Sequence, residues 1–324
     1  MKILYLIYQF ISYNRRIAYE KGILKVKKLK KPVISIGNLS FGGSGKTPFV
    51  IRLAKELLDR GLRVSILSRG YKRKSKGLVP VSDGFQILVS VEEAGDEPFL
   101  IAKTLPKAVV TVCEDRFLAG KFAEEENNVD IHILDDGFQH YKLHRDFDIL
   151  LFKNDENFKN KRFREPLKAL KRADYVFFIN NFSEELKNFL ELNFIKFSKI
   201  EILNYGFFSQ NDKVLDLNWI KENEWIALAG IGNPQKFFND LINFEIKIKK
   251  TFAFPDHYFP SKEDIKKIED VVKEEKVKGI ITTQKDIYKW SGNFEIIYHK
   301  IGFPPLDLKF LEKILRIYER KNKI

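Results

Sequence analysis

A glycine-rich segment that ends in a lysine and a threonine is the part of this sequence best suited to bind phosphate. Its sequence is SFGGSGKT, and it follows an apolar run at 33–36 and precedes an amphipathic stretch that begins at Pro48. Glycines allow consecutive backbone N–H groups to face a phosphate, and the start of a helix adds partial positive charge. The pattern therefore predicts a nucleotide site made of Ser40, Phe41, Gly42, Gly43, Ser44, Gly45, Lys46 and Thr47.

Within this loop, Lys46 is expected to bind the β- and γ-phosphate oxygens, and the hydroxyl of Thr47 is expected to bind Mg²⁺. The segment departs from the pattern G-x-x-x-x-G-K-[ST] at its first position, where Ser40 replaces glycine. Because Gly42 and Gly43 supply flexibility inside the loop, we interpret it as a variant of that pattern. The alternative is a flexible glycine-rich turn without a ligand.

Two adjacent aspartates follow a second apolar run. The segment IHILDD places Asp135 and Asp136 directly after residues that favour a buried strand. One carboxylate would hold Mg²⁺, directly or through water, and the other would orient water or substrate. A solvated turn that happens to contain two carboxylates is the alternative interpretation.

Two further segments could supply a base to a hydroxyl that attacks a γ-phosphate. The acidic turn GDEP contains Asp96, and the segment PDH places His257 beside a carboxylate. A histidine that follows a proline more often makes a loop hydrogen bond than catalyses a reaction. Two more histidines, His140 and His144, follow Asp136, but two histidines do not make a zinc site, and we assign no zinc.

The apolar runs alternate with amphipathic stretches, which predicts βαβ units and a doubly wound, mostly parallel sheet of the P-loop NTPase type. In the first half, strands are expected at 33–36, 63–67, 108–112, 129–134, 147–152 and 175–179. Later strands are expected at 199–207, 225–229, 244–254, 279–283 and 294–298. We therefore predict a P-loop α/β core domain at 32–185, which the family resemblance described below identifies as a kinase core, and a second, smaller α/β domain at 186–324 that contributes to the active-site cleft.

Two helices are expected in the second half. The first begins at Ser261, whose hydroxyl can cap it while Asp264 completes a capping box. The second, at 306–318, has the apolar periodicity of an amphipathic helix at the end of the chain.

The composition excludes disorder and a disulfide framework, because 44% of the 324 residues are apolar and Cys113 is the only cysteine. The net charge is +13, and residues 1–31 hold nine basic side chains and one acidic one. A nucleic-acid binder should have basic and aromatic residues on a groove of the folded body. Since most of the excess lies in one terminal segment, we expect no nucleic-acid partner.

The same terminal segment begins with the apolar run ILYLIY at residues 3–8. This run is much shorter than the ~20 residues that cross a bilayer, and its basic residues follow it, unlike those of a signal peptide. An aromatic, apolar helix followed by lysines and arginines is typical of a segment that lies on an anionic leaflet. We predict an amphipathic helix and a membrane-associating segment at 1–31; the alternative is a helix docked on the protein's own core.

Taken together, the motifs resemble those of the tetraacyldisaccharide 4′-kinase family, the lipid A kinases of Gram-negative bacteria. The resemblance covers nearly the whole chain, and DDGFQH combined with GDEP and FPDH is highly specific. The motifs are VISIGNLSFGGSGKTP (33–48), SRGY (68–71), AGDEP (94–98), CEDR (113–116), ILDDGFQHYKLHRDFDILL (133–151), REP (164–166), AGIGNPQKFF (229–238), FPDHY (254–258) and TTQKD (282–286).

The resemblance implies transfer of the ATP γ-phosphate to the 4′-hydroxyl of tetraacyldisaccharide 1-phosphate in lipid A biosynthesis, with Mg²⁺, at the cytoplasmic face of the inner membrane. The sequence shows no sign of an obligate protein partner. The family pattern places Lys46 and Thr47 on ATP and Mg²⁺, Asp135 and Asp136 in the metal region, and Asp96 with His257 as the base and its partner. Phosphate or sugar-phosphate contacts are expected from Arg69, Arg116, His140 and Arg164.

Two departures limit what the resemblance implies. Gln284 replaces the glutamate of the family's TTEKD motif, so a charge-dependent role at that position is not expected. The segment FKNKRF before REP also differs from the family's loop.

The alternative function is a P-loop GTPase or ATPase that acts in metallocentre or cofactor assembly. A GTPase of this kind should contain [NT]-K-x-D to recognise guanine. The segment TQKD at 283–286 has its lysine and aspartate adjacent, which does not fit that spacing.

Overall fold

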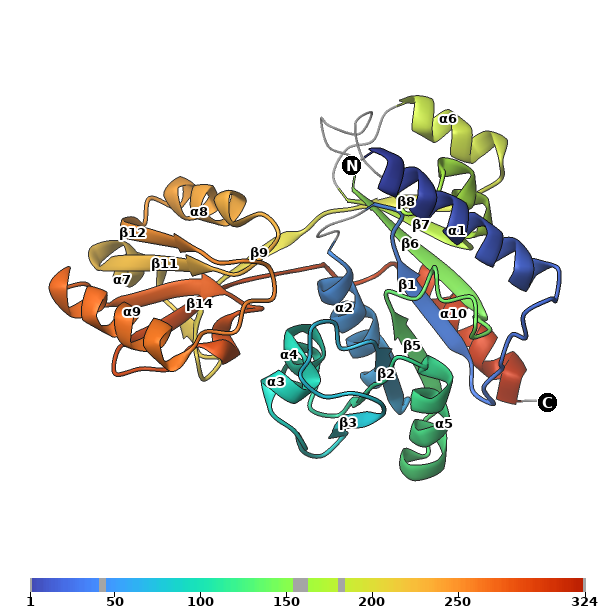
Figure 1. Ribbon diagram of the computed structural model, residues 1–324, viewed down its shortest axis with the longest axis horizontal. Coiled ribbons are helices and arrows are strands. Elements are labelled where there is room, and N and C mark those ends of the chain that lie inside the picture. The colour runs from blue at the N-terminus through green and yellow to red at the C-terminus, as the bar shows by residue number, and fades with distance from the viewer. Residues whose placement is uncertain (1, 41–44, 154–162, 180–183, 323–324) are drawn as a thin grey trace.

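The structure is a computed structural model that describes residues 2–40, 45–153, 163–179 and 184–322 (Figure 1). Four of the expected nucleotide-binding residues, Phe41, Gly42, Gly43 and Ser44, lie outside the described residues, as does most of the FKNKRF segment. The described chain forms two lobes, each built on its own sheet, which lie side by side in Figure 1.

The first sheet has the order β3-β4-β2-β5-β1-β6-β7-β8, and all its strand pairs are parallel except β3 with β4. The parallel strands confirm the expected doubly wound architecture. Their bounds are β1 (Val33–Gly37), β2 (Val64–Ser68), β4 (Val109–Val112), β5 (Ile131–Asp135), β6 (Phe147–Lys153), β7 (Tyr175–Ile179) and β8 (Phe197–Ile200). The edge strand β3 (Val79–Asp83) was not expected; it contains Pro80, which only an edge strand tolerates.

Helices cover both faces of this sheet. One face packs against α2 (Lys46–Leu58), α4 (Asp96–Thr104) and α10 (Leu308–Asn322), with the one-turn α3 (Val91–Ala94) beside α4. The other face packs against α5 (Arg116–Asn127), the 3-10 helix η2 (Leu167–Arg172) and α6 (Glu184–Leu192). The sheet is therefore buried on both sides, as a parallel sheet must be.

The second sheet has the order β10-β9-β14-β13-β11-β12. Its parallel strands are β11 (Glu224–Ala229), β12 (Lys247–Ala253), β13 (Gly279–Thr283) and β14 (Glu295–Gly302), while β9 (Leu203–Ser209) and β10 (Val214–Leu215) are antiparallel. One face packs against α7 (Leu217–Glu222) and α8 (Pro234–Asn243), and the other against α9 (Lys262–Glu274) and the 3-10 helix η3 (Ile287–Lys289). The expected capping box of Ser261 and Asp264 begins α9.

The expected domain boundary between residues 185 and 186 does not match the sheets. Helix α6 and strand β8 belong to the first lobe, so the predicted strand 199–207 is in fact two strands in different sheets. Helix α10 also returns to the first core, where Phe310, Leu311 and Ile314 are buried. The prediction was wrong because the apolar period of an element does not indicate which sheet it joins.

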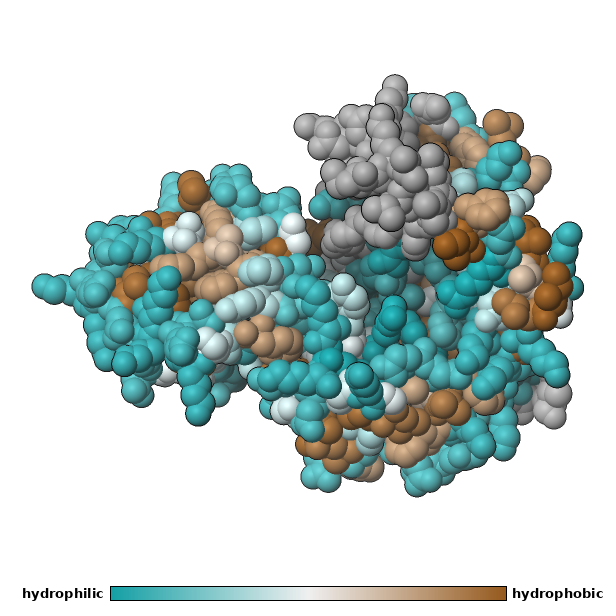
Figure 2. Space-filling model, in the orientation of Figure 1, coloured by the Kyte–Doolittle hydropathy of each residue, from teal (hydrophilic) through white to brown (hydrophobic). Residues whose placement is uncertain are grey.

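Helix α1 (Lys2–Glu20) confirms the predicted N-terminal helix, and it lies beside the first lobe (Figure 1). No helix in the described part of the chain is both long and apolar enough to cross a membrane. In the space-filling view, hydrophobic side chains stand among hydrophilic ones near the end of this helix and the loop that follows it (Figure 2), where Ile23, Leu24 and Val26 are exposed. The last residues of the predicted membrane-associating segment 1–31 pack on the first lobe instead. Lys27 forms a β-bridge with Leu143, and Leu29 is buried.

We expect the Gly37→Ala variant to lower the free energy of unfolding by about 2 kcal/mol, as overpacking of a core does. An added Cβ at Gly37 would lie 2.5 Å from the Cβ of the buried Phe138, in the loop that follows the two aspartates. Urea unfolding would measure the change. The control is Gly232→Ala, whose added Cβ has no neighbour closer than 3.7 Å. Equal stability of the two variants would contradict this packing argument.

Candidate active site

The described end of the phosphate-binding loop lies where β1 meets helix α2. Gly45 precedes the helix with φ +75°, and Lys46 is its first residue. The ammonium of Lys46 donates to Asn38 Oδ1 at 3.3 Å and lies 3.5 Å from Asp136 Oδ1. Strand β5 runs parallel to β1 with Asp135 opposite Ile36, so both motifs reach the same edge of the sheet. This edge is where open α/β sheets bind ligands.

The two aspartates have different surroundings. Asp135 is buried and accepts a hydrogen bond from Ser68 Oγ at 3.0 Å. Burial, together with the nearby Glu97 and Asp136 carboxylates, raises the pKa of Asp135 to about 7. Asp136 accepts bonds at 2.9 and 2.8 Å from one nitrogen of Arg164. Burial alone would raise the pKa of Asp136, but Lys46 and Arg164 outweigh it and lower that pKa.

Asp96 and His257 meet across the two lobes, although 161 residues separate them in sequence. Asp96 is the first residue of α4, is 2% exposed, and its Oδ1 accepts a bond from the backbone N–H of Glu97 at 2.9 Å. His257 follows β12, and its Nδ1 lies 2.8 Å from Asp96 Oδ1. Burial would raise the pKa of Asp96, but the hydrogen bond from His257 and two nearby lysines lower it strongly.

The two lysines come from the second lobe, and no role was predicted for either of them from the sequence. Lys289 Nζ donates to Asp96 Oδ2 at 2.9 Å. Lys285 Nζ lies 3.3 Å from His257 Nε2 and 3.6 Å from Asp96 Oδ2. The motif TTQKD contains Lys285 and could have indicated it, but nothing in the sequence pattern indicated Lys289. Glu97 was also missed, although it is the second acid of GDEP.

Three of the four residues expected to contact phosphate or sugar lie near one another. Arg116 is buried, and burial together with the like charge of Arg69 lowers its pKa. The carboxylates of Asp135 and Asp136 oppose that shift, which places Arg116 within their reach. Burial and Arg116 also lower the pKa of His140, to about 3, so His140 is neutral at pH 7.

Two buried nitrogens in this group, Arg116 Nε and His140 Nε2, have no hydrogen-bond partner among the described residues. An unpaired buried polar group is costly, so these atoms are suited to a polar ligand. Arg164, the fourth expected residue, is instead held against Asp136.

The carboxylates also bear on the expected Mg²⁺. Among the described residues, no group of three or more His, Cys, Asp or Glu side chains could hold a metal ion by itself. Mg²⁺ is usually bound by one or two carboxylates together with phosphate oxygens. Asp135 accepts a hydrogen bond from Ser68 and has a raised pKa because it is buried beside other carboxylates, and a divalent cation would stabilise its charge. The residues present therefore fit Mg²⁺ brought in with a nucleotide.

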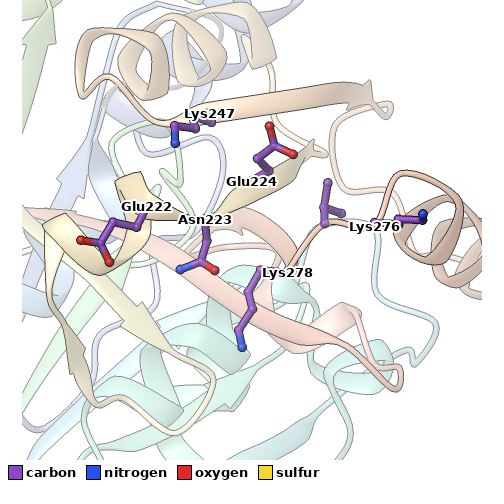
Figure 3. Close-up of a pocket in the computed structure, with 7 residues that line it drawn as sticks. Glu222, Asn223, Glu224, Lys247, Lys276 and Lys278 are labelled. Carbon is purple, nitrogen blue, oxygen red and sulfur yellow. The ribbon is translucent and has the colours of Figure 1, made fainter.

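A separate pocket lies at the edge of the second sheet where its parallel strands begin (Figure 3). It is lined by Glu224 at the start of β11, Lys247 at the start of β12 and Lys278 just before β13. Since His257 and Lys285 follow the carboxyl ends of β12 and β13, this pocket is remote from them. Its acidic and basic side chains are mixed, and we assign it no ligand.

Comparisons with known proteins agree over both lobes. The family model described as tetraacyldisaccharide-1-P 4′-kinase matches residues 1–318. The tetraacyldisaccharide 4′-kinase of Aquifex aeolicus is 44% identical over 292 residues, which is 88% of each chain. The one of Halothermothrix orenii is 34% identical over 338 residues, which is 95% of this chain and 88% of the other.

A solved structure is similar as well. The crystal structure of LpxK from Aquifex aeolicus in complex with ATP matches with a TM-score of 0.75 and 39% sequence identity, over 97% of both chains. The match supports the expected α/β class for both lobes. From the family model, the relatives and this structure together, the chain belongs to the tetraacyldisaccharide-1-P 4′-kinase family.

Proposed function

We propose that this protein transfers the γ-phosphate of ATP to the 4′-hydroxyl of tetraacyldisaccharide 1-phosphate, a step of lipid A biosynthesis. The observation that supports this most is the family match over residues 1–318, which includes both lobes. A P-loop ATPase of another class would share the first lobe but would not need the second-lobe histidine that reaches Asp96.

The nucleotide is proposed to bind at the start of α2. Lys46 would bind β- and γ-phosphate oxygens, since its ammonium lies at the helix N-terminus beside Asp136. Thr47, Asp135 and Asp136 would hold Mg²⁺, whose chemistry is to neutralise the charge on the phosphate oxygens. Before the nucleotide and Mg²⁺ bind, the positive charges of Arg164 and Lys46 balance the negative charge of Asp136.

Asp96 is proposed to accept the proton of the attacking 4′-hydroxyl, with His257 as its partner. The lowered pKa keeps Asp96 ionised at neutral pH, so the carboxylate is ready to accept a hydrogen bond. Phosphoryl transfer passes through a loose transition state, and its catalysis depends mostly on positioning and electrostatics. The contact between His257 Nδ1 and Asp96 therefore matters chiefly because it fixes where the carboxylate lies.

The sugar phosphate is proposed to bind to Arg69, Arg116, His140 and Arg164. Support comes from the unpaired Arg116 Nε and His140 Nε2 and from the exposed side chain of Arg69. Arg116 also interacts electrostatically with both aspartates and with His140. Arginine is well suited to this role because its planar guanidinium binds two phosphate oxygens at once.

Helix α1 is proposed to lie on the cytoplasmic face of the inner membrane, where an acylated substrate is found. On this helix, Phe10, Ile11 and Tyr13 are each more than half exposed. Between the helix and the first lobe, a pocket is lined by Tyr13 and Arg16 of α1 and by residues of the 164–172 segment, which includes the basic Arg164, Lys168 and Arg172. The exposed apolar residues and the basic segment suit an anionic lipid surface.

The experiment that tests this function is transfer of labelled γ-phosphate from ATP to detergent-dispersed tetraacyldisaccharide 1-phosphate. We expect labelled lipid that disappears when Mg²⁺ is chelated and in the Lys46→Ala variant. Phosphate released to water at the same rate with and without the lipid would instead support an assembly ATPase.

For Asp96→Asn, we expect kcat to fall about 10²–10⁴-fold, the usual contribution of general base catalysis. The KM for ATP should change less than twofold, because the side chains that bond to Asp96 are His257 and Lys289 of the second lobe, whereas the nucleotide is proposed to bind at the start of α2. Steady-state kinetics of the transfer reaction measure both. Loss of ATP affinity with an unchanged kcat would remove Asp96 from the role of base.

For the double variant Phe10→Ser and Ile11→Ser, we expect about tenfold weaker binding to vesicles that contain anionic lipid, since two exposed apolar side chains are lost. Binding should also weaken as salt rises. Flotation with vesicles measures both effects. Phe85→Ser is the matched control, because Phe85 is 92% exposed in the turn that follows β3. Equal binding of the variant and the control would return α1 to a purely structural role.

A further inference from the structure

Lys289 is a buried lysine of the second lobe that touches the first. Its side chain is 1% exposed, and its Nζ donates to Asp96 Oδ2 at 2.9 Å and to Asp286 Oδ1 at 2.8 Å. The ammonium also lies 5.2 Å from the centre of the Phe259 ring. A buried charge is tolerated only when it is paired, and here two carboxylates from different lobes pair with it.

Asp286 is itself fixed within the second lobe. Its Oδ2 accepts bonds from the backbone N–H of Gly230 at 2.9 Å and from Thr283 Oγ1 at 2.8 Å. The carbonyl of the same Gly230 accepts a bond from the backbone N–H of His257 at 3.2 Å. One residue at the end of β11 therefore anchors both the loop of His257 and the aspartate that holds Lys289.

The two groups meet at Asp96 Oδ2. His257 Nδ1 lies 2.8 Å from Oδ1 and 3.0 Å from Oδ2, while Lys289 Nζ donates to Oδ2 at 2.9 Å. Rotation of the carboxylate would move Oδ2 away from Lys289 Nζ, so this contact helps to set the carboxylate plane. The backbone N–H of Glu97 bonds to Oδ1 as well, but it belongs to the helix of Asp96 and moves with it.

Lys285, the other lysine nearby, is less suited to this task. Its Nζ bonds to Asp256 Oδ1 at 2.9 Å and lies 3.6 Å from Asp96 and 3.8 Å from Glu97. Its side chain is 16% exposed against 1% for Lys289. The ammonium of Lys285 is shared among three acids, whereas that of Lys289 bonds to Asp96 and Asp286.

From this geometry we propose that Lys289 is a positioning residue for Asp96: held by Asp286, it fixes the second carboxylate oxygen and makes the orientation of Asp96 depend on contact between the lobes. This inference rests on the proposed role of Asp96 as the base. Lys289 does not touch the nucleotide residues described above, so its effect should appear in turnover and not in ATP affinity.

The test is a double-mutant cycle in the lipid transfer assay, using Asp96→Asn, Lys289→Met and the variant with both changes. We expect Lys289→Met to lower kcat at least tenfold while the KM for ATP changes less than twofold. With Asp96→Asn already present, adding Lys289→Met should change kcat less than twofold, because the group it positions is gone. Lys250→Met is the control, since Lys250 pairs with Glu275 on the surface of the same lobe.

Lys289→Gln repeats the measurement if Lys289→Met does not fold, because its side chain stays polar but is one atom shorter and uncharged, so it should not hold Asp96 as the ammonium does; thermal unfolding shows which variants are folded. A wild-type kcat in Lys289→Met or Lys289→Gln would overturn the inference. So would effects that multiply in the double variant, since they would mean that Lys289 acts on the stability of the second lobe independently of Asp96. An Asp96→Asn variant with wild-type kcat would instead refute the proposed base, and the role of Lys289 with it.

Discussion

The burial of one carboxylate, that of Asp96, is the constraint on which the arrangement of the two lobes depends. A charged group that is 2% exposed must be paired, and helix α4 itself offers only the backbone N–H of Glu97. The remaining partners, His257 and Lys289, come from the second lobe. Asp96, the candidate base, therefore receives its side-chain hydrogen bonds from His257 and Lys289 only when the two lobes are in contact.

The fold makes this meeting possible because both sheets present the carboxyl ends of parallel strands to the same region. In the first lobe, β1 and β5 end beside the phosphate-binding loop and the two aspartates. In the second, β11, β12 and β13 lead to Gly230, His257 and Asp286. The antiparallel pair of β9 and β14 connects the lobes, and α10 returns the chain to the first core. The carboxylate of Glu97, next to Asp96, helps to raise the pKa of Asp135, so helix α4 also lies near the proposed metal site.

The sequence predicted the site residues that belong to short local motifs better than the contacts between residues far apart along the chain. Lys46 and Asp136 belong to short motifs that follow strands, and local patterns located both. The pairing of Asp96 with His257 spans 161 residues and came only from the family resemblance. Lys289 was missed because lysines are common on surfaces, and no local pattern marks one that is buried. The domain boundary was placed too early because amphipathic periodicity does not reveal which sheet an element covers.

The central claim is that Asp96 and His257 act as one unit in phosphoryl transfer. Its most direct test is the kcat of His257→Ala, of Asp96→Asn and of the variant with both changes, at saturating ATP and lipid. Residues that act as a unit are strongly non-additive. The account predicts that the double variant is no slower than the slower single variant, within about twofold. Losses that multiply in the double variant would show that the two residues act separately and would contradict it.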